Sequence, residues 1–204
     1  MSRLDELVTR IESMNIDESA EQSKRLLADL EAAARLDHGQ ELLVERFGSS
    51  SNVVVLRSLS FVLAQLAADE IVDNLPVILD FVEVIDTDDA STLINSVSAL
   101  KKHRPNSTLV ETLQARRPAV WRLIRACLIH SSKLVHLTVL EYLEQLYYDG
   151  HLRREWAESS LSQLTHTLAD WCETGDDDIA RDACVMLNLL TRPRTSGETN
   201  GAEM

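Results

Sequence analysis

The sequence predicts an all-α fold, and three observations support this prediction. Apolar residues recur at intervals of three and four along nearly the whole chain, which is typical of amphipathic helices. The 204 residues include 6 Gly and 4 Pro. A chain with many tight turns between strands would need more of both, because such turns require a positive or preset φ. The apolar run that begins at Val53 resembles a buried strand at first, but it continues at helical spacing.

In the first half of the chain, capping residues separate the apolar faces. Asp17 is a suitable N-cap, because its carboxylate can accept hydrogen bonds from the free N–H groups of a first helical turn. Gly48 is expected to follow a short helix as its C′ residue. Pro76 lies in a first turn, where the missing N–H has no cost. These signals predict helices at about 3–14, after 17, at 41–47, 53–68 and 76–85.

In the second half, acidic or serine-rich caps mark the helix starts. The run Asp86–Asp89 is expected to cap a helix that reaches Lys102, and Asp176–Asp178 to cap the last helix. Further helices are predicted at about 109–116, 118–129, 133–148, 154–171 and 178–190. Residues 191–204 are polar and aperiodic, so a disordered C-terminal tail is expected there.

Four segments share one layout, in which a Ser- or Asp-rich cap precedes small and apolar residues at helical spacing. They start near residues 50, 86, 131 and 177, at intervals of about 36, 45 and 46 residues. These intervals fall in or near the range of two-helix HEAT and three-helix armadillo units. The two segments most alike are Arg57-x-Leu59-x-x-x-Leu63-x-x-Leu66 and Arg181-x-Ala183-x-x-x-Leu187-x-x-Leu190.

This pattern resembles the first helix of a HEAT repeat, including its Arg and its alternation of small and apolar residues. The resemblance implies a short right-handed α-solenoid of about ten to eleven helices in HEAT/armadillo-like hairpins. One domain, 1–190, would then contain units at about 17–48, 51–85, 86–129, 131–172 and 177–190. An irregular helical bundle is the alternative, because it would show the same periodicity.

Motifs for catalysis or cofactor binding are not found in the sequence. The glycines are scattered, whereas a phosphate loop or a dinucleotide fingerprint needs them clustered. The six histidines include no H-E-x-x-H pair. Counted from Asp86, an EF-hand loop would place Ser91 where Gly is needed and Val97 where Glu is needed. We therefore predict no catalytic residue, no metal, no cofactor and no enzymatic activity.

Charge and cysteine content favour a cytoplasmic protein with a basic partner. The formal net charge of −13 opposes binding to nucleic acids and favours a cationic protein. The first residues lack the apolar segment of a secretory signal, and no apolar run approaches the length of a membrane span. The three cysteines, Cys127, Cys172 and Cys184, have no C-x-x-C spacing, so free and mostly buried thiols are expected.

Acidic residues are concentrated in one part of the chain. Residues 51–100 carry a formal charge of −7, and no Lys or Arg occurs from Ser58 to Leu100. In HEAT solenoids the second helices line the concave surface, so the resemblance implies that the helix after Pro76 presents an acidic face with an apolar shoulder. The alternative is that these carboxylates serve solubility alone. The residues expected to bind a basic partner are Asp69, Glu70, Asp73, Val77, Asp80, Phe81, Glu83, Val84 and Asp86.

A secondary basic patch follows in residues 101–160, which carry a formal charge of +4. It consists of Arg116, Arg117, Trp121, Arg122 and Arg125. These cations are expected either to pair with the neighbouring acidic unit, to contact phosphates or to support self-association.

The function expected first is a non-enzymatic interaction module or scaffold, for example an immunity- or antitoxin-like inhibitor of a cationic toxin. The alternative is a nucleic-acid-binding protein or an enzyme that resembles the HEAT-like DNA glycosylases or bilin lyases.

Overall fold

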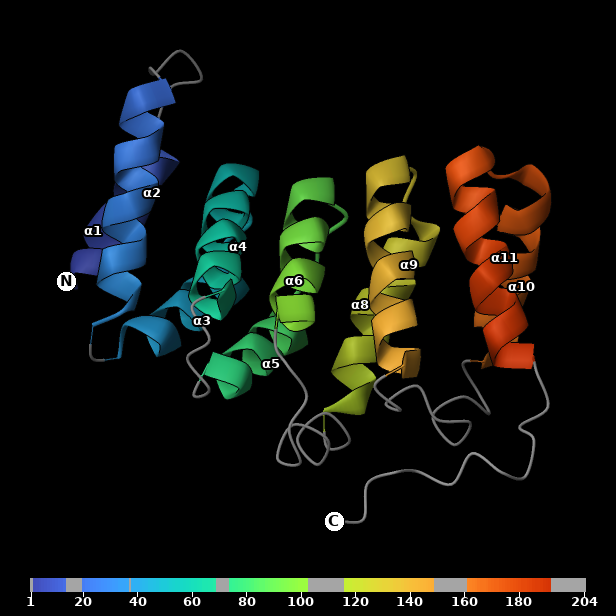
Figure 1. The fold of residues 1–204 in the computed structure, drawn as a ribbon. Helices are drawn as coiled ribbons and strands as arrows, with labels where there is room; N and C mark the ends of the chain where they lie inside the picture. The colour runs from blue at the N-terminus through green and yellow to red at the C-terminus, as the bar shows by residue number, and fades with distance from the viewer. Residues whose placement is uncertain are drawn as a thin grey trace. The chain divides into compact units, whose positions relative to one another are not determined.

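The computed structural model describes residues 2–13, 20–36, 38–68, 74–102, 116–148 and 161–191. Every regular element in these ranges is an α-helix, and no strand occurs among them (Figure 1). The prediction of an all-α fold is therefore confirmed. The helices are α1 (Arg3–Glu12), α2 (Ala20–Ala34), α3 (Gly39–Ser49), α4 (Val53–Ala68), α5 (Asn74–Val84), α6 (Ala90–Lys102), α8 (Arg117–Ile129), α9 (Lys133–Tyr148), α10 (Leu161–Thr174) and α11 (Asp177–Thr191).

Most helix boundaries lie close to the predicted ones, and α4 and α9 have the predicted bounds. The prediction for Gly48 is wrong, because α3 continues through it and ends with Ser50 as its C-cap. Gly48 is exposed in the last turn of α3, next to Val84 of α5. The Asp17 cap, the helix at 109–116, residues 154–160 and the tail beyond Thr191 lie outside the described residues.

The chain consists of two compact units, Met1–Tyr142 and Leu143–Met204, with the boundary inside α9. In the first unit, α4 packs against α2 and α6, and these three helices stand beside one another in Figure 1. A second set of neighbours is formed by α5, which packs against α3 and α8. None of the described helices has the length and hydropathy needed to cross a membrane.

The core of the first unit lies between these two sets of helices. Leu59 and Leu63 of α4, Leu93 of α6 and Leu123 of α8 are fully buried. Phe81 of α5 is also fully buried, and its ring centroid lies 3.9 Å from that of Phe47 in α3. Helix α5 is therefore enclosed on more sides than a simple amphipathic pattern predicts.

Polar side chains connect α4 to α6 across the core boundary. Arg57 donates hydrogen bonds from Nε (2.9 Å) and a terminal nitrogen (2.7 Å) to one carboxylate oxygen of Asp89. Asn95 donates to the buried Ser60 hydroxyl at 3.1 Å. Lys102 donates to the Ala64 carbonyl at 3.1 Å, near the other end of α6. Polar contacts at three positions along α4 and α6 thus hold the two helices together, in addition to their apolar contacts.

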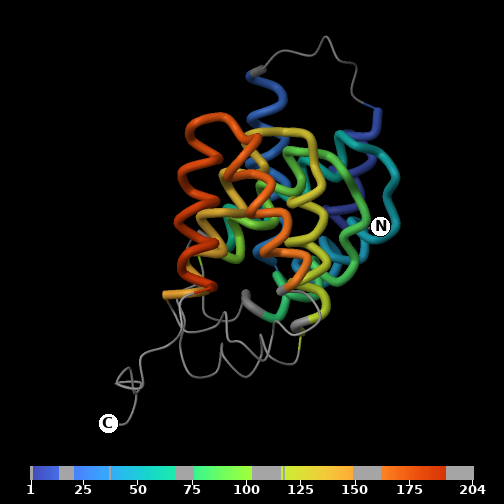
Figure 2. Tube along the Cα trace, turned by 90° about the vertical axis from the view of Figure 1, so that its right-hand side faces the viewer, coloured from blue at the N-terminus to red at the C-terminus, as the bar shows by residue number. Residues whose placement is uncertain are grey.

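The described part of the second unit contains a helical hairpin of α10 and α11. The two helices run side by side in Figure 1 and in the perpendicular view of Figure 2. Gly175 permits the tight connection, because a Cβ atom at this position would lie 2.5 Å from the Trp171 carbonyl oxygen. Leu164 and Leu168 of α10 and Ala183 and Met186 of α11 are buried.

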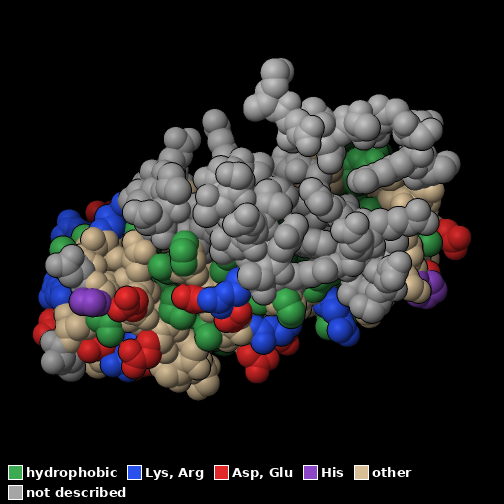
Figure 3. Space-filling model, turned by 90° about the horizontal axis from the view of Figure 1, so that it is seen from below, with side chains coloured by type: hydrophobic (Ala, Val, Ile, Leu, Met, Phe, Trp, Pro, Cys, Tyr) green, Lys and Arg blue, Asp and Glu red, His purple; other side chains and the backbone are tan. Residues whose placement is uncertain are grey.

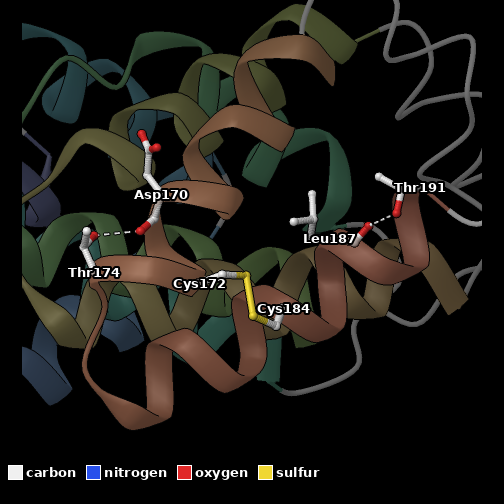
Figure 4. Close-up of a disulfide and its surroundings, with 6 residues drawn as sticks. All are labelled: Asp170, Cys172, Thr174, Cys184, Leu187 and Thr191. Carbon is white, nitrogen blue, oxygen red and sulfur yellow. Dashed lines mark hydrogen bonds between the residues drawn. A yellow bond between two sulfur atoms is a disulfide. The ribbon is translucent and has the colours of Figure 1, made fainter.

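A disulfide joins the two helices of this hairpin. It links Cys172 of α10 with Cys184 of α11, whose Cα atoms are 5.3 Å apart (Figure 4). The expectation of three free thiols is therefore wrong for these two residues. Cys172 lies near the end of α10 and Cys184 in the middle of α11, so the hairpin brings together residues 12 positions apart. Cys127 is a free, buried thiol, and burial raises its pKa to about 12.

Candidate functional site

The acidic face predicted on α5 is paired with a cation from α8. Arg116, at the start of α8, lies 2.9 Å from Asp80 and also forms an ion pair with Glu83. The pKa of the Arg116 guanidinium is raised, mainly because of its hydrogen bond with Glu83. Two of the predicted acidic residues and one predicted basic residue therefore form one cluster, as expected if the basic patch pairs with the neighbouring acidic unit.

Two residues predicted for binding surfaces are in the core instead. Phe81 is fully buried against Phe47, and Trp121 of the basic patch is 7% exposed. Phe81 lies on α5, which packs against α3, α4, α6 and α8, and Trp121 lies on α8, which packs against α5 and α6. The Trp121 indole Nε1 has no hydrogen-bond partner among the described residues. These two aromatic side chains contribute packing in the first unit.

The remaining predicted residues differ in their surroundings. Val77 is half-buried, Val84 is 40% exposed and Asp86 is exposed. Arg125 is exposed on α8. Asp69, Glu70 and Asp73 lie outside the described residues, as does the side chain of Arg117.

Arg122 is bound to the end of α5. Its guanidinium donates a hydrogen bond of 2.9 Å to the Val82 carbonyl and a second one to the Glu83 carbonyl. These carbonyls belong to the last turn of α5, where helix carbonyls lack intrahelical partners and carry partial negative charge. Arg122 therefore stabilises the junction between α5 and the loop that follows it.

The loop between α5 and α6 has one capping carboxylate and two exposed carboxylates. Asp89 accepts hydrogen bonds of 2.9 Å from the Thr92 backbone N–H and hydroxyl, which makes it the N-cap of α6. Burial raises the pKa of Asp89, but hydrogen bonds from Arg57 and Thr92 outweigh this and hold it below its ordinary value. Asp86 and Asp88 are exposed and have no ion-pair partner in the part of the chain that the structure describes.

These two carboxylates border a surface groove of about 410 Å³. Its apolar lining comes from Ile85 and Leu93, which are buried, and from Ala126 and Ile129 of α8; the other lining residues are Asp86, Thr87, Asp88 and Arg122. Ile129 is 81% exposed, the largest exposed fraction among the exposed large apolar side chains of the described residues. The groove thus combines an apolar lining with two unpaired carboxylates.

A histidine fixes one side of this groove. The ring of His130 accepts a hydrogen bond at Nδ1 from the Ser132 backbone N–H at 2.8 Å. This leaves Nε2 as the protonated nitrogen, which donates to the Asp88 carbonyl at 2.7 Å. The turn after α8 is therefore bonded to the loop before α6, and this contact holds one side of the groove in place.

Figure 3 shows how charge is distributed on one face of the molecule. Where described residues are visible, basic and acidic side chains lie directly beside one another, with hydrophobic side chains between them. This mixture of charges agrees with the ion pairs that Arg116 forms with Asp80 and Glu83.

The sequence predicted Asp86 and Arg122 of this groove but missed its apolar lining. Ile85, Leu93 and Ile129 were not among the residues predicted for a binding surface. One signal was available, because Ile129 directly precedes the polar run His130–Ser132.

The described residues contain no group of three or more His, Cys, Asp or Glu side chains placed to bind a metal ion. No significant match was found to a family model, a curated protein or a solved structure.

Proposed function

We propose that this chain is a non-enzymatic protein-interaction module, built as a short HEAT/armadillo-like right-handed solenoid, that binds a basic protein. The packing of the first unit supports the repeat architecture, because α2, α4 and α6 are successive neighbours and α3, α5 and α8 are another such set. Repeat proteins of this kind commonly bind partners along an extended surface.

One observation carries the proposal. After the described ion pairs have formed, Asp86 and Asp88 remain as exposed carboxylates beside the exposed Ile129. Carboxylates next to an exposed apolar group suit a cationic partner that also covers apolar surface. The net charge of −13 would attract such a partner at long range.

The proposed binding surface differs from the one that the sequence suggested. The proposed surface is centred on the loop between α5 and α6. It is not centred on Asp80 and Glu83, because both form ion pairs with Arg116. An immunity- or antitoxin-like inhibitor of a cationic toxin is one concrete form of this function.

Nucleic-acid binding receives less support. Arg116 is engaged by two carboxylates, Arg122 by backbone carbonyls, and Trp121 is buried and cannot stack on a base.

The proposal is tested by cross-linking the full chain in its native cells and identifying the linked proteins by mass spectrometry. We expect a basic protein, with cross-links that map to residues 84–93 and 126–133. Exchanging Asp86 and Asp88 for Lys should abolish its capture, while Glu12→Lys with Glu173→Lys, which changes the net charge equally, should retain it. Equal loss with both pairs of substitutions would show that net charge and not this surface determines capture.

A further inference from the structure

We propose that the groove beside the α5–α6 loop accepts one apolar side chain from an extended basic segment of the partner, with Lys or Arg residues on either side of it contacting Asp86 and Asp88. This inference rests on the proposed function, and it names the chemistry of the segment that is bound.

On the apolar side of the groove, one lining residue, Ile129, is largely exposed to solvent. Ile85 and Leu93 are buried below the surface, whereas Ile129 projects from the last turn of α8 with 81% of its surface exposed. An apolar side chain placed between them would remove Ile129 from water, which is favourable in proportion to the area covered. This part of the groove thus favours a branched or aromatic side chain.

The charged side of the groove selects the residues that flank this anchor. Asp86 and Asp88 are the lining residues with unpaired carboxylates in the described structure, and Arg122 is held by the Val82 and Glu83 carbonyls. A Lys or Arg beside the anchor would be attracted electrostatically by both carboxylates, whereas an acidic residue would be repelled. The groove therefore discriminates between basic and acidic segments with the same anchor.

The volume of the groove and the hydrogen bonds of its loop limit the size of the bound segment. About 410 Å³ is near the lower end of the range of roughly 300–1,000 Å³ for small-ligand sites, so one anchoring side chain and its neighbours fit better than a whole helix. The loop is already ordered by the Thr87 hydroxyl, which accepts from the Asp89 N–H at 3.0 Å, and by the His130 contact. Binding therefore requires little ordering of the protein.

The test uses three fluorescein-labelled peptides and the full chain. They contain the cores KKLFKK, KKGSKK and EELFEE, and binding is measured by fluorescence anisotropy at low and at physiological salt. We expect saturable binding of the first peptide, and affinities at least about tenfold weaker for the other two, which lack the anchor or the cations.

Variants then locate the binding site. Ile129→Ser should weaken KKLFKK binding about tenfold, because it removes the exposed apolar wall. Asp86→Asn with Asp88→Asn should weaken it about threefold at low salt and less at high salt. One matched control is Leu36→Ser, which also replaces an exposed large apolar residue (63% exposed). The other is Glu12→Gln with Glu173→Gln, and both controls should bind like the wild type. Circular dichroism melting curves verify that every variant is folded.

Three outcomes would overturn the inference: equal binding of EELFEE and KKLFKK, wild-type binding by Ile129→Ser, or a chain dimer that Ile129→Ser dissolves. The third outcome would assign the groove to a second copy. A natural partner that stays bound to Ile129→Ser would leave the proposed function intact and reject the groove as its site, whereas failure to capture any basic partner would count against the proposed function itself.

Discussion

The helix pairs α4–α6 and α10–α11 are both closely packed, but different interactions hold them together. The first pair combines fully buried side chains with polar contacts, of which Arg57–Asp89 and Asn95–Ser60 span the two helices. The second pair is joined by the Cys172–Cys184 disulfide. Among the described residues, α10 and α11 have fewer buried apolar side chains than α4 and α6.

In the described residues, the α10–α11 pair thus combines fewer buried apolar side chains with a covalent link. A disulfide stabilises mainly by restricting the unfolded chain, so it needs little buried surface. Buried contacts and caps stabilise the folded state directly and do not depend on redox conditions. The two regions should therefore respond to different perturbations.

The largest effect is expected from the core of the first unit. Phe81→Ala should reduce the free energy of unfolding by about 3–5 kcal/mol, because a fully buried ring in tilted contact with the Phe47 ring is lost. Urea denaturation followed by circular dichroism measures the change. If the free energy of unfolding falls by less than about 0.5 kcal/mol, as is usual for a surface position, Phe81 would be exposed, as the sequence suggested.

The next effect concerns the second unit. Replacing Cys172 and Cys184 with Ser should lower stability by about 2–3 kcal/mol in oxidising buffer, the value typical of a short disulfide loop. The difference from the wild type should disappear in the presence of a reductant. Cys127→Ala provides the control, since it changes a buried thiol without removing the bridge. An unchanged wild-type melting curve on reduction would show that the bridge does not stabilise the hairpin.

A smaller, pH-dependent effect is expected at Asp89. Asp89→Ala should cost about 1–2 kcal/mol at neutral pH, through loss of the α6 cap. Because the folded-state pKa of Asp89 lies below the unfolded value of about 3.9, its contribution is complete above that value and is lost as the pH falls through the folded pKa. Denaturation of both proteins between pH 7 and pH 2.5 should show the difference shrinking with acid. A constant difference across this range would contradict the role of the charged carboxylate.

The smallest effect is expected for Arg116→Ala. Its ion pairs with Asp80 and Glu83 are partly exposed, and such pairs contribute about 0–1 kcal/mol. Arg125→Ala, which removes an exposed cation from the same helix, is the control in the same denaturation assay. If Arg116→Ala alone lowers the free energy of unfolding by more than 2 kcal/mol, the ion pairs with Asp80 and Glu83 would contribute more to stability than exposed pairs do.

The sequence allowed the helices to be predicted well and the site only in part. Periodicity and caps locate helices because both depend on neighbours in the chain, as the bounds of α4 and the Asp89 cap show. The surroundings of Phe81 depend on α3, which is distant in sequence, so the amphipathic pattern of α5 misplaced it. The groove needs Ile85, Leu93 and Ile129 from three segments, and local patterns do not show that these meet.

Hydrogen–deuterium exchange of the full chain with the KKLFKK peptide tests the central claim most directly. We predict slower exchange in the segments 85–93 and 126–133, which surround the groove, and unchanged exchange in α11. The same experiment on Ile129→Ser should show no slowing. Protection confined to α11, or equal protection in wild type and Ile129→Ser, would contradict the assignment of the groove as the binding site.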